Sequence, residues 1–344
     1  MNTAQTVLLR SPHNPVLAPL PHLPWAKHKV YNSAVYLEHN LYHLIFRAIG
    51  DDWVSRLGHA TSHDGHTFTV EEEPLLVPDT KWDSAGLEDP RLTSIGRVHY
   101  LLHTAYDKDC ARLALASSRD LHHWHKHGPI LPDWDTPLWS TRVNAQAKNW
   151  SKAGALFPQK VNGRYLLYFG DHHIWPAWSD NLTQWSPDQE PVLSPRPGFF
   201  DAGYLEMGPP PILTDKGWLI IYHGINAIDD VPGQPRIYCL GAALLDKENP
   251  AKVIARSAKP LLQPEGHERV GLIDIIEGGF EMLNTLSHEE LERRAEEGLL
   301  PQAVFCCGAI LKDGQVQIYY GAADTSLGQA SSSLEDILAH LQPA

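Results

Sequence analysis

Short apolar runs recur along the chain, and each ends in polar residues. Their lengths are those of strands rather than of helices. The five clearest runs are residues 43–47, 100–104, 165–169, 218–223 and 316–320. Glycine-containing turn signals such as Asn162-Gly163 and Asp313-Gly314 come before most of them. The pattern predicts a β protein in which one strand-and-turn design is repeated.

A second motif follows the first three runs, with an aromatic residue eight positions after an alanine and a Ser/Asp/Asn turn between them. Its copies are residues 60–68, 116–124 and 177–185, with degenerate copies at 242–246 and 329–333. A strand, a tight turn and a return strand whose aromatic side chain fills the space between sheets explain this spacing. Five such units, roughly fifty to sixty-five residues apart, predict an all-β fold, a five-bladed β-propeller with one four-stranded blade per repeat.

Only two segments have a helical pattern. Residues 287–297 begin with Ser287 as N-cap and Glu290 three positions later, and we expect them to be a short helical insertion in the last blade. Residues 333–341 are expected to form a C-terminal helix on the outside. No linker divides the chain, so residues 1–344 are expected to form a single propeller domain.

Composition narrows the class of partner. The chain has 28 basic and 41 acidic residues, a formal net charge of −13, which argues against nucleic acid and anionic membranes. No signal peptide pattern and no membrane-length apolar run is present, and the four cysteines form neither a disulfide framework nor a zinc spacing. A cytoplasmic protein is expected, with monomer and dimer both open. Eleven Trp and twelve Tyr suit a carbohydrate partner, although most aromatic residues in any protein are core.

Polar residues at the strand ends are the first site candidates, because a propeller directs these ends into its central funnel. The set is Arg47, His103, Asp107, Asp171, His172, His223 and Asp324. Taken singly, such a residue more often caps a turn. Five repeats that converge by symmetry nevertheless predict a site, and its mixture of acids and bases is what glycoside chemistry requires.

The segment Glu88-Asp89-Pro90-Arg91 is the most distinctive in the chain. Proline fixes its own φ and disfavours the helical region for the residue before it, so we expect Asp89 to be extended and its carboxylate to be rigidly aimed. The alternative is a structural turn in which Glu88 or Asp89 pairs with Arg91.

The order of several segments resembles glycoside hydrolase family 130, from about Asn14 to the C-terminus. The segments are residues 31–34, 46–47, 86–91, 156–158, 208–212, 218–224 and 319–324. The most specific are the Glu-Asp-Pro-Arg turn and the Tyr-Tyr-Gly-Ala-Ala-Asp sequence that ends at Asp324. The resemblance implies a five-bladed propeller that acts on β-mannosides, as a phosphorylase or as a hydrolase.

The resemblance also implies roles for individual residues. Asp89 matches the general acid, which protonates the glycosidic oxygen through a hydroxyl of the sugar. Asn32, Ser33, Arg47 and Asp324 match residues that hold the −1 mannosyl ring. The implied chemistry is inverting, so phosphate or an activated water attacks from the opposite face.

Departures from the family pattern favour a hydrolase, closer to the β-1,2-mannosidase branch. Asp171 and Tyr204 stand where phosphorylases carry an arginine and a lysine, and carboxylates at Asp171 and Glu206 would repel phosphate. Glu206 is therefore the expected base, with a structural hydrogen-bonding role as its alternative. Glu268 is a second candidate base, whose alternative is a solvated loop residue.

The competing hypothesis is a β-mannoside phosphorylase that uses inorganic phosphate and releases mannose 1-phosphate. His223 is retained, and the third blade offers four residues that can supply positive charge: Arg142, Lys148, Lys152 and Lys160. Glu88, Arg91, His172 and Tyr204 complete the expected substrate-binding set for a mannose-containing oligosaccharide. A propeller that binds carbohydrate without catalysis is a further alternative, which Asp89 argues against.

No cofactor and no metal site is expected. The adjacent pairs His172-His173 and His122-His123 are poor chelates, because neighbouring residues on a strand point to opposite faces.

Overall fold

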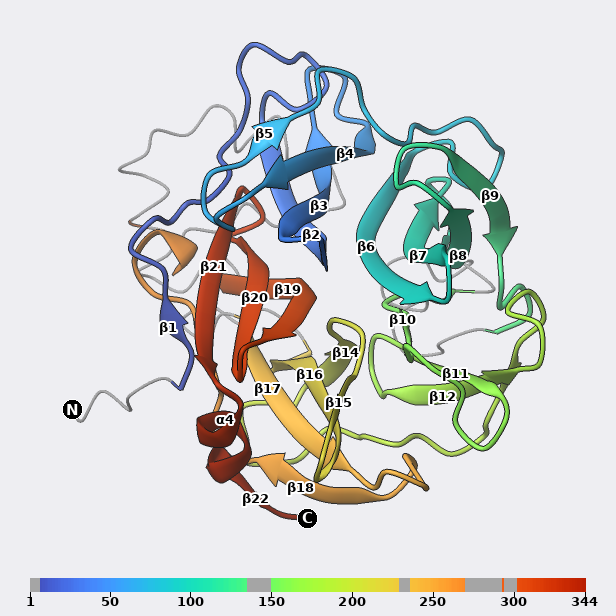
Figure 1. The fold of residues 1–344 in the computed structure, drawn as a ribbon, viewed down its shortest axis with the longest axis vertical. Helices are drawn as coiled ribbons and strands as arrows, with labels where there is room; N and C mark the ends of the chain where they lie inside the picture. The colour runs from blue at the N-terminus through green and yellow to red at the C-terminus, as the bar shows by residue number, and fades with distance from the viewer. Residues whose placement is uncertain (1–6, 135–149, 229–235, 270–292, 294–301) are drawn as a thin grey trace.

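The computed structural model describes residues 7–134, 150–228, 236–269, 293 and 302–344. In these residues, regular structure is almost entirely β, and the strands lie in groups around a common centre (Figure 1). Hydrogen bonding joins the described strands into three sheets of ten, four and eight strands. Short parallel pairs, β4 with β6 and β17 with β19, link neighbouring parts of the two larger sheets, and between these links the strands form five antiparallel groups. The all-β class is confirmed, and the grouping agrees with a five-bladed propeller.

The first two groups come from the N-terminal part of the chain. The first contains β2 (Lys29–Glu38), β3 (Leu41–Ile49), β4 (Ser55–Ser62) and β5 (Thr69–Val70). The second contains β6 (Gly86–Ile95), β7 (Val98–Tyr106), β8 (Ala111–Ser118) and β9 (Trp124–Pro129). The third contains β10 (Ala155–Leu156), β11 (Tyr165–Phe169), β12 (Trp175–Ser179) and β13 (Ser186–Pro187).

The last two groups are joined to the chain termini. The fourth contains β14 (Tyr204–Met207), β15 (Ile212–Thr214), β16 (Gly217–Ile225), β17 (Ile237–Leu245) and β18 (Val253–Ser257). The fifth contains β19 (Gln302–Lys312), β20 (Gln315–Ala322), β21 (Ser326–Ser333) and the N-terminal β1 (Leu9–Arg10). A 3-10 turn (Gly266–Arg269) lies between these groups in sequence. After β21 come α4 (Leu334–His340) and β22 (Leu341–Pro343), and β22 pairs with β18.

The repeated serine turn forms as the sequence predicts. In its first copy the Ser62 hydroxyl accepts the Gly65 N–H at 2.9 Å, and Asp64 accepts the N–H groups of His66 and Thr67 at 2.8 Å. Ser118 with Asp120 and Ser179 with Asn181 repeat these bonds. The aromatic residues that follow, Phe68, Trp124 and Trp185, pack on the apolar clusters between groups. Local hydrogen bonding therefore fixes the turn, and apolar packing fixes the return strand.

The inner strands of the first three groups share an irregularity that the sequence did not reveal. In each group, three positions along the inner strand span two positions along its neighbour. The pairs are Tyr31↔Arg47 with Ala34↔Ile45, Glu88↔Thr104 with Arg91↔Leu102, and Lys152 bonded to Gly170 with Ala155↔Tyr168. Such a bulge redirects the side chain that it contains.

Each of these bulges contains a residue with positive φ. The angles are 47° at Asn32, 48° at Asp89 and 53° at Ala153. The expectation of an extended Asp89 is thus wrong, because the bulge places it in the left-handed region despite Pro90. Aspartate and asparagine adopt this region more readily than most residues.

The C-terminal helix is confirmed as α4, where the Ser333 hydroxyl accepts the Asp336 N–H at 3.0 Å. The helical insertion expected at residues 287–297 lies outside the described residues, and a single domain stays a prediction. No helix in the described part of the chain has the length and hydropathy needed to cross a membrane.

Candidate active site

The bulges of β2 and β6 bring the expected acid and its sugar-binding neighbours together. Asn32 donates its side-chain amide to the Asp89 carboxylate at 2.9 Å. Arg47 donates to the same carboxylate oxygen at 3.4 Å and to Glu88 at 2.7 Å. Its Nε is held by the Ser55 hydroxyl at 2.9 Å. The structure therefore assembles Asn32, Arg47, Glu88 and Asp89 in one network.

Asn32 is held close to β20 and keeps unused hydrogen-bonding capacity. A Cβ at Gly321 would lie 2.1 Å from Asn32 Oδ1, so only glycine leaves room for this amide. Among the described residues, Asn32 Oδ1 and the Ser33 hydroxyl are buried without a hydrogen-bond partner. Because buried polar groups normally have partners, these two atoms are suited to a ligand hydroxyl.

The charges around Asp89 determine its protonation. Burial raises the pKa of this carboxyl, but Arg47 and Arg91, with the Asn32 hydrogen bond, lower it further than burial raises it. The net pKa lies below the usual value, so Asp89 is ionised at neutral pH in the protein without ligand.

Arg91 donates its hydrogen bonds to the backbone rather than to a carboxylate. Its guanidinium donates to the carbonyls of Met207 at 2.8 Å, Gly208 at 3.2 Å and Asp89 at 2.8 Å. The alternative interpretation, a structural turn in which Arg91 pairs with Glu88 or Asp89, is therefore not found. Instead, Arg91 fastens the β6 bulge to the end of β14.

A second group of charges comes from the third and fourth strand groups. Lys152 Nζ lies 3.1 Å from Glu206 Oε1, and both side chains are largely buried. Burial lowers the pKa of Lys152, but the negative charges of Glu206 and Asp171 outweigh it and raise the net pKa. Lys152 therefore stays a cation and contributes to the potential at Asp89.

Asp171 has the opposite tendency. The Trp150 indole donates to one of its oxygens at 2.8 Å, and its other oxygen has no partner in the described residues. Burial raises the pKa of Asp171 to about 6, in spite of Lys152 and with the support of Glu206. Asp171 thus gains a proton far more readily than an exposed aspartate.

Three further candidates surround Glu206. His223 is its register partner on β16, accepts the Cys306 N–H at 2.9 Å and stacks on Phe305. Burial first, and then Arg91, hold the pKa of His223 well below its usual value, so the ring is neutral. The Tyr204 hydroxyl bonds that of Tyr238, and the His172 carbonyl accepts the Leu205 N–H at 3.0 Å.

Asp324 lies in the turn between β20 and β21, with a φ of 49°. The adjacent Thr325 carbonyl accepts the Val30 N–H at 3.0 Å, which places this turn beside the start of β2, near Asn32. Arg142 and Lys148, two of the predicted cations, lie outside the described residues.

Glu268 does not join this network and is not a solvated loop residue. It is 1% exposed, pairs with Arg10 at 2.5 Å and accepts the Tyr320 hydroxyl at 2.7 Å. These contacts tie β1 to β20 and contradict the interpretation as a solvated loop residue, whereas a role of Glu268 as base stays a prediction.

Two strand-end candidates also have other surroundings. His103 is buried near Lys126 and Asp83, and burial lowers its pKa to about 4. Asp107 caps a turn and pairs with Arg112 at 2.6 Å.

Lys152 is the residue that the sequence interpretation undervalued. The segment that contains Lys152 cannot be aligned with the other repeats by the ends of their strands. In the structure, however, Lys152 stands at the start of its bulge, as Tyr31 and Glu88 do in β2 and β6. Alignment of the inner strands, rather than of the strands that follow them, would have located it.

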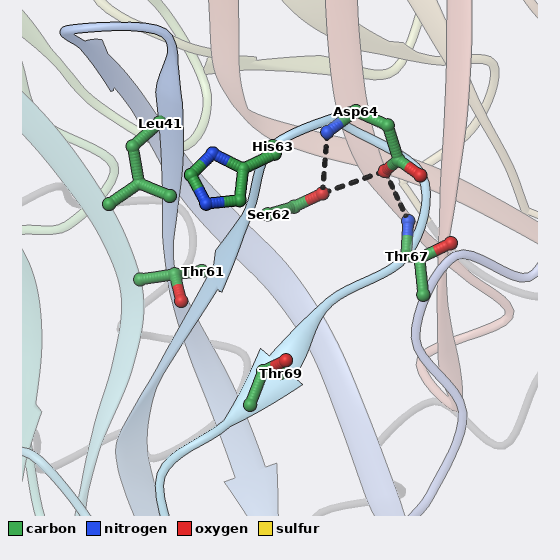
Figure 2. Close-up of a pocket in the computed structure, with 7 residues that line it drawn as sticks. All are labelled: Leu41, Thr61, Ser62, His63, Asp64, Thr67 and Thr69. Carbon is green, nitrogen blue, oxygen red and sulfur yellow. Dashed lines mark hydrogen bonds between the residues drawn. The ribbon is translucent and has the colours of Figure 1, made fainter.

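A separate surface hollow of about 370 Å³ lies on the first strand group (Figure 2). It is lined by Leu41, Thr61, Ser62, His63, Asp64, Thr67 and Thr69, none of which is a predicted site residue. The candidate active site is therefore defined by the network at the bulges and not by this hollow.

Comparisons with known proteins identify the family. The family model described as β-1,4-mannooligosaccharide phosphorylase matches residues 11–276. Two proteins of Thermoanaerobacter sp. strain X514 are similar to this chain, and each alignment covers 96% of this chain and 98% of the relative. They are 1,2-β-oligomannan phosphorylase, 35% identical, and β-1,2-mannobiose phosphorylase, 32% identical.

A solved structure has a TM-score of 0.76 and 26% identity over 100% of this chain and 97% of its own. It comes from work stating that this family of mannoside phosphorylases contains glycoside hydrolases that target β-1,2 mannosidic linkages in Candida mannan. These two relatives, and a β-1,2-mannobiose phosphorylase of Listeria innocua that is 31% identical over 82% of this chain and 68% of its own, contradict the expectation of a hydrolase. The resemblance itself is confirmed: the chain belongs to glycoside hydrolase family 130.

Proposed function

We propose that this protein is a phosphorylase of β-1,2-linked mannosides. The observation that carries the proposal is the similarity, over 96% of the chain, to two relatives named as phosphorylases of β-1,2-linked mannose. On this proposal inorganic phosphate is the co-substrate, and no cofactor is required. The predicted obstacle, repulsion of phosphate by two carboxylates, has to be weighed against the charges at the site.

Those charges support anion binding. Arg47, Arg91 and Lys152 all contribute positive potential at Asp89. Lys152 offsets the negative charge of Glu206, its ion-pair partner. With its pKa raised to about 6, Asp171 is easily neutralised, and a phosphate dianion nearby would raise that pKa further. The two carboxylates are therefore a weaker barrier to phosphate than their formal charges suggest.

The proposed reaction is a single displacement. Asp89 gives its proton to the glycosidic oxygen, with a sugar hydroxyl as relay, and the bond between that oxygen and C1 breaks. A phosphate oxygen forms the new bond to C1 from the opposite face, so a β-mannoside yields α-mannose 1-phosphate. Asn32, Ser33, Arg47 and Asp324 hold the mannosyl ring in this proposal.

Phosphate binding also explains how Asp89 can gain the proton that a general acid donates. Asp89 is ionised without ligand because cations surround it. A phosphate dianion bound to these cations reduces their effect and raises the pKa of Asp89, which favours the protonated form that a general acid needs.

The test is a phosphate titration with β-1,2-mannobiose as substrate. We expect a rate that saturates with phosphate. Mannose 1-phosphate, followed by ³¹P nuclear magnetic resonance, and mannose should form in equal amounts. Release of two mannose molecules per disaccharide at a rate independent of phosphate would refute the proposal. A β-1,4-mannobiose control checks the linkage, and equal rates on the two disaccharides would refute the β-1,2 preference.

A further inference from the structure

A cluster of two histidines and a glutamate joins the first two strand groups, away from the Asp89 network. His59 is on β4, Glu71 follows β5, and His122 is in the turn between β8 and β9. Their potential ligand atoms all lie within 4.8 Å of one another. Glu71 Oε1 is 2.7 Å from His59 Nδ1 and 3.3 Å from His122 Nδ1. Three ligand atoms from three separate segments therefore converge on one point.

We propose that His59, Glu71 and His122 form a binding site for a divalent transition metal of the zinc class. Imidazole nitrogen with carboxylate oxygen suits zinc, whereas calcium and magnesium prefer oxygen ligands alone. Zinc bonds of about 2.1 Å in a tetrahedron put neighbouring ligand atoms about 3.4 Å apart. The 3.3 Å separation already fits, and the 2.7 Å separation has to widen by less than about 1 Å.

The surroundings of His59 provide a second shell. Its ring is fully buried, stacks on His43 and places Nε2 3.1 Å from His43 Nδ1. When His59 Nδ1 binds a metal, Nε2 carries the ring proton and donates a hydrogen bond to His43 Nδ1. Ligating histidines in proteins generally use their second nitrogen in this way, which fixes the orientation of the ring.

The site is also open to an entering ion. The side chains of Glu71 and His122 are 42% and 52% exposed, so water can reach the ligand atoms and occupy the fourth position. His123 is 90% exposed and pairs with Asp120 instead. The sequence hypothesis rejected His122 and His123 as an adjacent pair, whereas the structure separates them and gives His122 different partners.

Binding would link two groups of strands. His59 and Glu71 belong to the first group and His122 to the second, so a bound ion holds the two together. Since the ion binds the folded chain only, it stabilises the fold by mass action. This inference does not depend on the proposed activity.

The experiment starts from full-length protein freed of metal with a chelator, then titrated with zinc chloride by calorimetry and thermal unfolding. We expect one equivalent to bind, and Tm to rise by about 4 °C at a zinc concentration 100 times the dissociation constant. Cobalt as a probe should give the visible absorption of a tetrahedral site.

Three variants decide the location of the site. His122→Ala and Glu71→Gln should each abolish the zinc-dependent Tm rise and the cobalt spectrum, whereas His123→Ala, from the same turn, should retain both. Each rise is measured against the variant's own metal-free Tm, so a change in basal stability does not affect the result. The proposal is overturned if wild type shows no rise, or if the rise persists in His122→Ala and Glu71→Gln.

Discussion

At the scale of single residues, the candidate site depends on the surroundings of two buried carboxyl groups, those of Asp89 and Asp171. Asp89 is held ionised by the cations near it, and Asp171 is brought towards neutrality by burial. Both side chains are deeply buried, so water screens these interactions weakly. A change of one charge at either residue should consequently be measurable.

Replacement of the acid tests the central assignment. Asp89→Asn keeps the shape and tolerates the left-handed backbone but cannot donate a carboxyl proton, so kcat should fall by about 10²–10⁴. Steady-state kinetics on β-1,2-mannobiose, with a circular dichroism spectrum to verify folding, measures this. Asp107→Asn is the control and should retain full activity, because Asp107 only caps a turn and pairs with Arg112. Wild-type kcat in Asp89→Asn would reject the assignment.

Asp171 should affect stability as pH changes. Its folded pKa of about 6 lies above the ordinary aspartate pKa of 3.8, so between these values the folded chain holds a proton that the unfolded chain has lost. Stability from this group is therefore present at low pH and is lost as pH rises through 4 to 6, by up to about 1.4 kcal/mol per pH unit.

Asp171→Asn does not titrate and should lack this loss. Urea unfolding of the two proteins at pH 4.5, 5.5 and 7 measures the difference, in which the other titrating groups cancel. Parallel stability curves would contradict the shifted pKa.

At the scale of elements, the recurring feature is the bulge in the inner strands. Asn32 and Asp89 meet because each lies in a bulge at the same level of neighbouring groups. The Asn32 bulge in turn needs Gly321 on β20, whose hydrogen leaves space for the Asn32 amide. A substitution at Gly321, in the fifth group, should therefore change the hydrogen bonding of Asp89, in the second group.

Gly321→Ala tests this dependence. The added methyl group displaces the Asn32 amide, and we expect KM for β-1,2-mannobiose to rise at least about tenfold and stability to fall by about 1–3 kcal/mol. Gly314→Asn, in the turn of the same hairpin, is the control, because nothing lies within 4 Å of its added Cβ and Asn tolerates its positive φ. An unchanged KM in Gly321→Ala would show that the amide position is irrelevant to binding.

The elements that the sequence predicted are those with local causes. Ser62 and Asp64 bond N–H groups within five residues of themselves, so the turn is visible in the sequence. The bulge at Asp89 was missed because it depends on register with Thr104 and Leu102, which no local rule supplies. The site candidates came mainly from family resemblance and their roles stay predictions, whereas the buried partners of Lys152 and Glu268 became visible only in three dimensions.

At the scale of the whole molecule, the N-terminal strand completes the last group. β1 pairs with β21, and Arg10 on it reaches the buried Glu268. The partners in this ion pair are 258 residues apart, which explains why the sequence suggested a solvated glutamate. An ion pair at this position contributes to closure of the fold.

Arg10→Ala should leave the Glu268 charge buried and unpaired, at a cost of about 3–5 kcal/mol in unfolding free energy. Glu265→Ala is the matched control, since Glu265 is 56% exposed and its contact with Arg10 contributes at most about 1 kcal/mol. Equilibrium unfolding in urea compares the two variants. Equal losses would mean that burial of Glu268 has no energetic weight.

The pairing of the chain ends has a consequence for biosynthesis. Asn32 and Asp89 leave the ribosome before Gly321, Asp324 and β21 are made, and a ribosome adds only about 5–20 residues per second. During those seconds the nascent polypeptide has the proposed acid, Asp89, without the proposed sugar-binding residue Asp324. On this assignment catalytic competence begins only once β21 has been made, and a product of premature termination before β20 would be inactive from the outset.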